Sequence, residues 1–141
     1  MLNLESKFGV VVKEHLENEY FIWMTTVDSS GTPQPRPVWF IWEDDSFLIY
    51  SEPNTYKVKH LENNSNVSLH FNTKDNKADE HIIIFSGEAS FDKNSPPAHN
   101  VPAYFEKYKI GFEELNLTPE GFSSKYSKAI RIKPTKVRGW E

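Results

Sequence analysis

Residues 20–51 read YFIWMTTVDSSGTPQPRPVWFIWEDDSFLIYS, and this stretch decides the fold class. β-Branched and aromatic residues dominate segments 20–27, 35–42 and 47–51, which is the composition of β-strands. The segments 28–31 and 43–46 are made of Asp, Ser, Gly and Glu, which favour turns. Strands joined by short turns run antiparallel, so the sequence predicts the start of an antiparallel sheet.

The rest of the chain adds further strands and several helices to this sheet. The apolar spacing of residues 3–17 predicts a helix, and residues 56–61 predict a short helix with Asn54 or Thr55 as N-cap. We expect strands at 67–71 and 81–89, helices at 103–110 and 119–126, and one or two strands at 129–140. The 141 residues suit one domain, residues 1–141, and six antiparallel strands favour a barrel because closure hides the strand edges.

Composition excludes several classes of site. The chain has no cysteine, so disulfides, iron–sulfur clusters and cysteine nucleophiles are excluded. The net charge is −4, without the basic excess that general nucleic-acid binding requires, so we expect no nucleic-acid partner. No run approaches the ~20 apolar residues that span a bilayer, and the N-terminus does not resemble a signal peptide. We therefore expect a cytoplasmic protein with no membrane partner.

A phosphate site is predicted where the strand 47–51 gives way to the helix that begins near Tyr56. Free N–H groups and the dipole at a helix N-terminus favour phosphate, and Lys57 would add a charge-assisted contact. Ser51 and Thr55 supply hydroxyls at the same place, and Arg36 would form a second arm. The alternative is an ordinary capped helix with solvated lysines and a surface arginine.

Tryptophans are the second feature that suggests a ligand. Trp39 and Trp42 are separated by an odd number of positions, so in a regular strand they lie on opposite faces. A planar ring on a groove wall would stack on an aromatic cofactor, and Trp140 near the terminus would be covered by a partner subunit. The alternative is packing in the core or in an interface, which for Trp42 is the better interpretation.

Other catalytic motifs are missing from the sequence. It contains no Gly-x-Gly-x-x-Gly run, no Walker loop and no Gly-x-Ser-x-Gly nucleophile elbow. The five histidines form no His-x-x-x-His pair, so we predict no metal site. We identify no general acid or base, and the catalytic residues stay unknown at this point.

Several segments taken in order resemble a known family. They are GTPQPRPVWFIW at 31–42, FLIYS at 47–51, YKVKHL at 56–61, NVSLHF at 66–71, SGEA at 86–89 and IKPTKVRGW at 132–140. This set is similar to the pyridoxamine 5′-phosphate oxidase-like superfamily of FMN-binding split β-barrels, which form homodimers with the cofactor between protomers. The resemblance implies a mainly β, six-stranded antiparallel split β-barrel with flanking helices, and these cofactor-binding residues: Arg36, Pro37, Val38, Trp39, Tyr50, Ser51, Thr55, Tyr56, Lys57 and Trp140.

Departures from the family pattern bear on the reaction. Members that oxidise pyridoxamine phosphate carry a basic residue where this chain has Ile41, and a glutamine that touches the flavin where it has Ile82. They also carry an Arg-x-His motif beyond the final Trp, which is missing from a sequence ending at Glu141. We therefore expect an enzyme other than a true pyridoxamine phosphate oxidase.

The closer likeness is to the short subfamily of coenzyme F-420-dependent enzymes. It implies an oxidoreductase that transfers hydride to or from an unidentified small-molecule substrate, with FMN as cofactor and coenzyme F-420 as the alternative. A second alternative is a non-enzymatic protein that binds or stores the flavin. The same pocket residues serve each case.

Overall fold

The computed structural model describes residues 2–73 and 81–140, with the side chain of residue 140 excepted. Four α-helices and one short 3-10 helix occur in this part of the chain: α1 Lys7–Asn18, α2 Tyr56–Asn63, η1 Ala98–Asn100, α3 Pro102–Glu114 and α4 Pro119–Lys125. Seven strands accompany them: β1 Phe21–Val27, β2 Pro33–Trp39, β3 Ile41–Glu43, β4 Ser46–Ser51, β5 Asn66–His70, β6 Ile82–Phe91 and β7 Lys128–Trp140.

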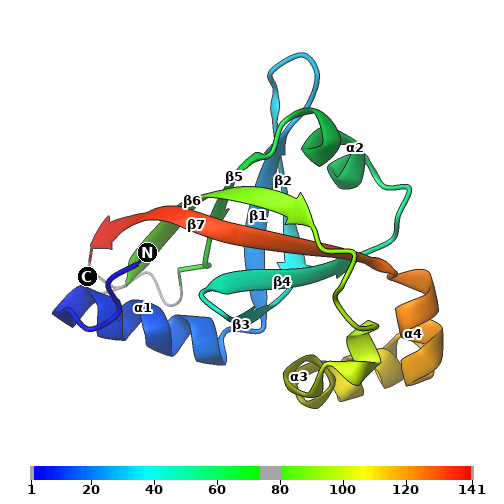
Figure 1. The fold of residues 1–141 in the computed structure, drawn as a ribbon. Helices are drawn as coiled ribbons and strands as arrows, with labels where there is room; N and C mark the ends of the chain where they lie inside the picture. The colour runs from blue at the N-terminus through cyan, green and yellow to red at the C-terminus, as the bar shows by residue number, and fades with distance from the viewer. Residues whose placement is uncertain (1, 74–80, 141) are drawn as a thin grey trace.

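The strands form one antiparallel sheet in the order β2-β1-β5-β6-β7-β4-β3. The two outermost strands, β2 and β3, are consecutive in the chain and are separated by Phe40 alone. One residue bridges only a few ångströms, so the sheet must curl until its two edges approach each other. Figure 1 shows this half-barrel, with α1 and α2 near opposite ends of the strands and α3 and α4 to one side.

The prediction of six strands is therefore wrong, and the reason lies at Phe40. The sequence predicts one strand over residues 35–42, joined by a hairpin turn to the strand 47–51. Instead β2 pairs with β1, while only β3 pairs with β4. The chain changes partner strand at Phe40, so one apolar run is divided into two strands. The antiparallel sheet with flanking helices is confirmed.

Local turns agree with the residue types that predict them. Asp28 Oδ1 accepts hydrogen bonds from the backbone N–H groups of Ser30 and Thr32, at 2.9 Å each, and Gly31 has a positive φ of 84°. Asp44 and Asp45 have φ values of 53° and 56° in the hairpin turn between β3 and β4. Asp tolerates this left-handed region better than most residues, which explains its use in a two-residue hairpin.

Apolar residues form two clusters, one inside the curl and one outside it. The inner cluster includes Ile22, Met24, Phe40, Phe47 and Phe85, all fully buried. The outer cluster places the helical segment 98–126 against the outer faces of β3, β4 and β7. No helix in the described ranges is long and apolar enough to cross a membrane.

Helix α3 closes the fold over the β2–β3 crossover. The Tyr108 hydroxyl accepts a hydrogen bond from the Phe40 N–H at 2.8 Å and lies 2.9 Å from the Phe40 carbonyl oxygen. Lys107 Nζ donates to the same carbonyl at 2.8 Å. The backbone groups of Phe40, which belongs to neither strand, are satisfied in this way by two side chains of one helix.

Candidate functional site

A pocket lies where the curled sheet brings β2 next to β4 and to the start of α2. We call it the β2–β4 pocket. Its volume is about 280 Å³, and its walls are Phe21, Pro37, Val38, Trp39, Tyr50, Lys57, Tyr104, Leu115, Phe122 and Tyr126. Five of these ten residues belong to the predicted cofactor set, although they come from two strands and a helix.

Arg36 and Lys57 form a cationic corner beside this pocket. Arg36 Nη1 donates to Thr26 Oγ1 at 3.0 Å, and burial lowers the pKa of the Arg36 guanidinium. Burial lowers the pKa of the Lys57 amine, and the charge of Arg36 lowers it further, while Glu52 acts in the opposite direction. Within the described ranges neither cation has a carboxylate within 4.0 Å. Two neighbouring cations without an ion pair favour a bound anion.

The N-terminus of α2 is open to the same corner. Thr55 is the N-cap residue of α2, yet its side chain makes no capping hydrogen bond. Its hydroxyl donates instead to the Glu52 carbonyl at 3.3 Å, and Ser51 Oγ donates to that carbonyl at 2.9 Å. The N–H groups of the first helical turn are therefore free to bind an anion. The hydroxyls of Ser51 and Thr55 already donate their protons to the Glu52 carbonyl, so in this arrangement they can only accept hydrogen bonds.

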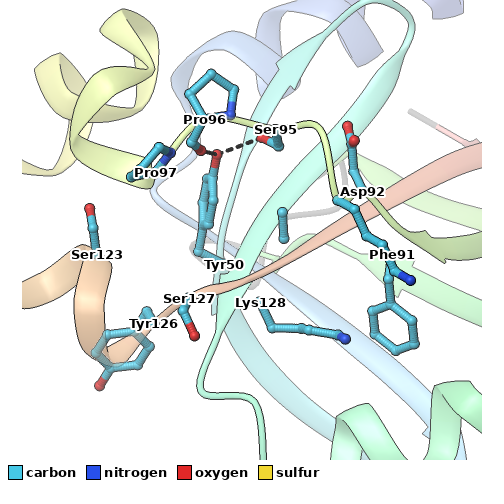
Figure 2. Close-up of a pocket in the computed structure, with 12 residues that line it drawn as sticks. Tyr50, Phe91, Asp92, Ser95, Pro96, Pro97, Ser123, Tyr126, Ser127 and Lys128 are labelled. Atoms are coloured by element: carbon cyan, nitrogen blue, oxygen red, sulfur yellow. Dashed lines mark hydrogen bonds between the residues drawn. The ribbon is translucent and has the colours of Figure 1, made fainter.

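Tyr50 lines the pocket with its ring but turns its hydroxyl away from it. The hydroxyl donates to the Pro96 carbonyl at 2.6 Å and lies 2.7 Å from Ser95 Oγ (Figure 2). Burial raises the pKa of Tyr50. A second cavity of about 330 Å³ lies on the far side of this ring, between loop 91–97 and the segment 123–129. The Tyr50 proton is thus held by the protein's own loop.

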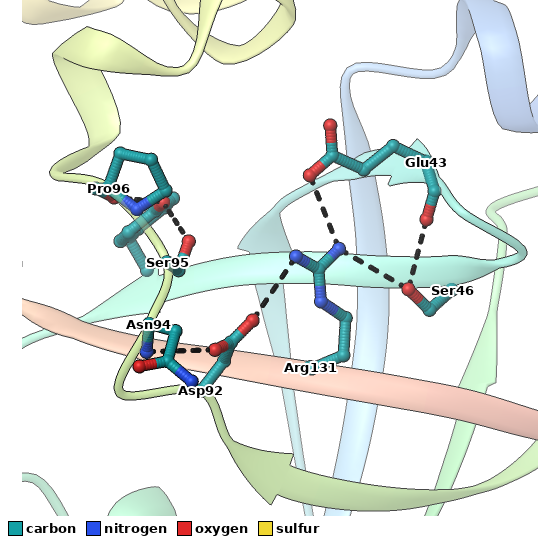
Figure 3. Close-up of polar contacts among 8 residues, drawn as sticks. Glu43, Ser46, Asp92, Asn94, Ser95, Pro96 and Arg131 are labelled. Atoms are coloured by element: carbon teal, nitrogen blue, oxygen red, sulfur yellow. Dashed lines mark hydrogen bonds and ion pairs between the residues drawn. The ribbon is translucent and has the colours of Figure 1, made fainter.

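The loop that receives the Tyr50 hydroxyl is anchored to the sheet by Arg131. The guanidinium of Arg131 lies 3.4 Å from Asp92 Oδ2 and 3.3 Å from Glu43 Oε1 (Figure 3). Asp92 also accepts a hydrogen bond from the backbone N–H of Asn94 at 3.0 Å. These contacts connect β3, β7 and the loop after β6, and so fix the wall of the pocket at Tyr50.

Trp39 is held in place by the helical segment. Its ring stacks on Tyr108, with centroids 4.5 Å apart and planes at 8°, and lies 5.6 Å from Phe122 at 19°. Trp42 packs against Phe47 on the inner side of the sheet, so the two tryptophans occupy opposite faces as predicted. Trp39 forms part of the pocket wall, and stacking on a cofactor stays a prediction.

The remaining predicted residues lie at the margins or outside the described part. Tyr56 is 76% exposed and faces away from the β2–β4 pocket, on the same side as Arg36. The side chain of Trp140 lies outside the described residues; its backbone pairs with Ile82. No cluster of three or more His, Asp or Glu residues in the described ranges has a geometry that would hold a metal ion.

Sequence reasoning missed half of the pocket wall. Tyr104, Leu115, Phe122 and Tyr126 come from the helical segment, and Phe21 from the start of β1. The aromatic spacing at 104, 108 and 112 shows which face of α3 is buried. It does not show that this face covers β2 and β4, because that contact is long-range.

Comparison of the sequence with known proteins identifies the family of the chain. The sequence model described as "Pyridoxamine 5'-phosphate oxidase" matches residues 11–141. The chain belongs to the pyridoxamine 5′-phosphate oxidase family. A curated relative, the pyridoxine/pyridoxamine 5′-phosphate oxidase of Vibrio parahaemolyticus, is 39% identical over 61 residues, which is 43% of this chain and 29% of that protein. The matched segment is less than a third of the relative's length.

Solved structures share the fold of this family member at low sequence identity. A conserved hypothetical protein of Mycobacterium tuberculosis superimposes with a TM-score of 0.77 and 16% identity, covering 96% of this chain and 84% of that one. A protein described as an F420 reductase gives a TM-score of 0.64 and 16% identity, covering 89% and 94%. At 16% identity, these two likenesses show a shared split-barrel fold and carry no statement about function.

Proposed function

We propose that this protein binds FMN in the β2–β4 pocket and is an oxidoreductase that transfers hydride to or from a small-molecule substrate. The observation that carries the proposal is the cationic corner of Arg36 and Lys57, which lacks an ion pair in the described structure and borders an aromatic-walled pocket. The open N-terminus of α2 would receive the FMN phosphate together with Lys57 and Arg36. A bound flavin supplies the redox chemistry, and the protein supplies binding and orientation.

The proposal excludes pyridoxamine phosphate oxidation on the basis of two positions. Ile41 is 4% exposed and packs in the outer apolar cluster, so it offers no cation to a phosphate. Ile82 stands where family members that oxidise pyridoxamine phosphate carry a flavin-contacting glutamine. The substrate is therefore a different small molecule.

Coenzyme F-420 is the alternative cofactor, supported by the fold shared with a protein described as an F420 reductase. Its phosphate would use the same corner. A protein that binds or stores the flavin without turnover is the second alternative. The visible spectrum of the purified protein separates flavin, deazaflavin and haem, and oxidation of NAD(P)H in the presence of an acceptor separates an enzyme from a binder.

Replacement of Lys57 tests the phosphate placement. Lys57→Ala removes a charge-assisted contact, so we expect the Kd for FMN to rise about tenfold or more, while Lys57→Arg retains most of the affinity. Quenching of flavin fluorescence measures both constants. Lys13→Ala is the control, because the Lys13 side chain on α1 is 58% exposed, and it leaves the Kd unchanged. Equal FMN affinity in Lys57→Ala and the wild-type protein would show that the phosphate lies elsewhere.

A further inference from the structure

A third cavity, lined by polar residues, lies on the other side of Arg36, between α2 and the β1–β2 turn. We call it the α2 groove. Its volume is about 520 Å³, and it is formed by turn residues 28–30, Gln34 and Arg36 on one side and by one face of α2 on the other. That face carries Tyr56, Lys59, His60 and Asn63, which are spaced by three or four positions and therefore lie on one side of the helix.

The charges in the α2 groove favour an anion. Arg36, Lys59 and His60 line it, and in the part of the chain that the structure describes neither Arg36 nor Lys59 has an ion pair. His60 Nδ1 is 2.9 Å from Thr26 Oγ1, which also accepts the hydrogen bond from Arg36, so these two groups are held together.

Asp28, the one carboxylate among the described residues that line the groove, is hydrogen-bonded within its own turn. Asp28 accepts hydrogen bonds from the Ser30 hydroxyl at 2.6 Å and from Gln34 Nε2 at 3.0 Å, in addition to two backbone N–H groups. These donors hold the pKa of Asp28 well below its usual range. The negative charge of Asp28 opposes anion binding in the groove. It forms no ion pair with Arg36 or Lys59 in the described structure, so both cations stay available to an anion.

Tyr56 adds an aromatic surface at the edge of the groove. The residue is 76% exposed, although its aromatic ring is large. Lys59 Nζ lies 5.6 Å from the ring centroid, and the His60 ring lies 6.5 Å away at 29°. An exposed aromatic ring next to unpaired cations is the combination that binds a base together with a phosphate.

We propose that the α2 groove binds a nucleoside phosphate, with its phosphate at Arg36 and Lys59 and its base on Tyr56. The inference rests on the proposed function, because Arg36 connects this groove to the corner assigned to the flavin phosphate. The nucleotide is either the adenylate half of FAD, joined to a flavin phosphate at Lys57, or a separate nucleotide such as AMP. Both sources present the same chemistry to the groove.

The experiment compares FMN, FAD and AMP as probes by calorimetric titration. If the adenylate is tethered, we expect FAD to bind at least about tenfold tighter than FMN. If it is separate, AMP binds to the FMN-loaded protein and FAD shows no such advantage. In both cases Lys59→Glu removes the additional binding, and the Kd for FMN changes by less than about threefold. Tyr56→Ala weakens the additional binding as well, because the base loses its stacking surface.

The control is Lys7→Glu, an equal charge change on α1, which lies at the other end of the sheet from α2 (Figure 1). The inference is overturned if FMN binds, FAD binds no tighter and AMP does not bind, and the proposed function then stands. If neither flavin binds, the proposed function fails. In that case, AMP binding that is lost in Lys59→Glu would still support a nucleotide site in the α2 groove. Absence of AMP binding would overturn the inference as well.

Discussion

Tyr104 and Tyr108 lie one turn apart on α3, and both side chains are fully buried. The Tyr108 hydroxyl lies 2.7 Å from the Tyr20 carbonyl and 2.9 Å from that of Phe40, and it accepts the Phe40 N–H. The Tyr104 hydroxyl has no hydrogen-bond partner among the described residues. Burial raises the pKa of both tyrosines, so each remains neutral.

The same substitution at these two residues should have different effects. Tyr108→Phe leaves the buried Phe40 N–H without its acceptor and removes the one hydroxyl proton shared by the Tyr20 and Phe40 carbonyls, of which the Phe40 carbonyl keeps Lys107. We therefore expect the free energy of unfolding to fall by about 2 kcal/mol. Tyr104→Phe removes an unpaired hydroxyl, so the change should be below about 0.5 kcal/mol or stabilising. Urea unfolding of the two variants measures both. Equal losses would mean that the Tyr108 hydrogen bonds do not hold the crossover.

At the scale of elements, α3 fixes the β2–β3 crossover through Lys107 as well. Lys107 Nζ donates to the Phe40 carbonyl and lies 3.8 Å from the centre of the Phe40 ring. Burial lowers the pKa of Lys107 to about 8, and the Glu19 carboxylate opposes this shift. The unfolded chain keeps a lysine pKa of about 10.4. Folding therefore disfavours the charged amine at neutral pH.

The pH dependence of stability should report this amine. Between about pH 8 and 10.4 the unfolded chain binds more protons at Lys107 than the folded chain, so this group makes the free energy of unfolding rise with pH. Lys107→Met removes the rise. The stability of the wild-type protein relative to this variant should increase by roughly 1–2 kcal/mol from pH 7.5 to 10, allowing for solvent screening.

Urea unfolding across this pH range measures the difference. The control is Lys109→Met, in which an exposed lysine of the same helix is replaced. Its stability should follow the wild-type curve. A Lys107→Met curve parallel to that of the wild-type protein would show that the amine keeps an ordinary pKa.

The sequence predicts elements whose causes are local. Thr118 caps α4 through the Gly121 N–H, with Pro119 at the first helical position, and helix α4 begins where these residues indicate. The division of β2 from β3 was not predicted, because Phe40 is apolar like its neighbours and only the change of partner strand distinguishes it. The pocket residues divide in the same way. Lys57 can be predicted from its position at the start of a helix, whereas Phe122 lines the pocket through a long-range contact that the local sequence does not indicate.

At the scale of the whole molecule, the β2–β4 pocket has an apolar rim exposed to solvent. Phe21 is 47% exposed and Leu115 is 46% exposed, and both line the pocket, while Tyr20 beside Phe21 is 39% exposed. Apolar residues gathered at the edge of a pocket are typical of an interface. We propose that a second copy of the chain covers this rim and completes the flavin site.

This arrangement couples assembly to cofactor binding. Sedimentation should give a mass about twice 16.4 kDa. Leu115→Glu places a charge in the interface, so we expect a monomer whose Kd for FMN is raised about tenfold or more. Val10→Glu, at a 56% exposed apolar residue of α1, is the matched control and should leave both unchanged. The coupling would be refuted if the wild-type protein had the same Kd for FMN as a monomer, at low protein concentration, as it has as a dimer. The rim would then need no partner.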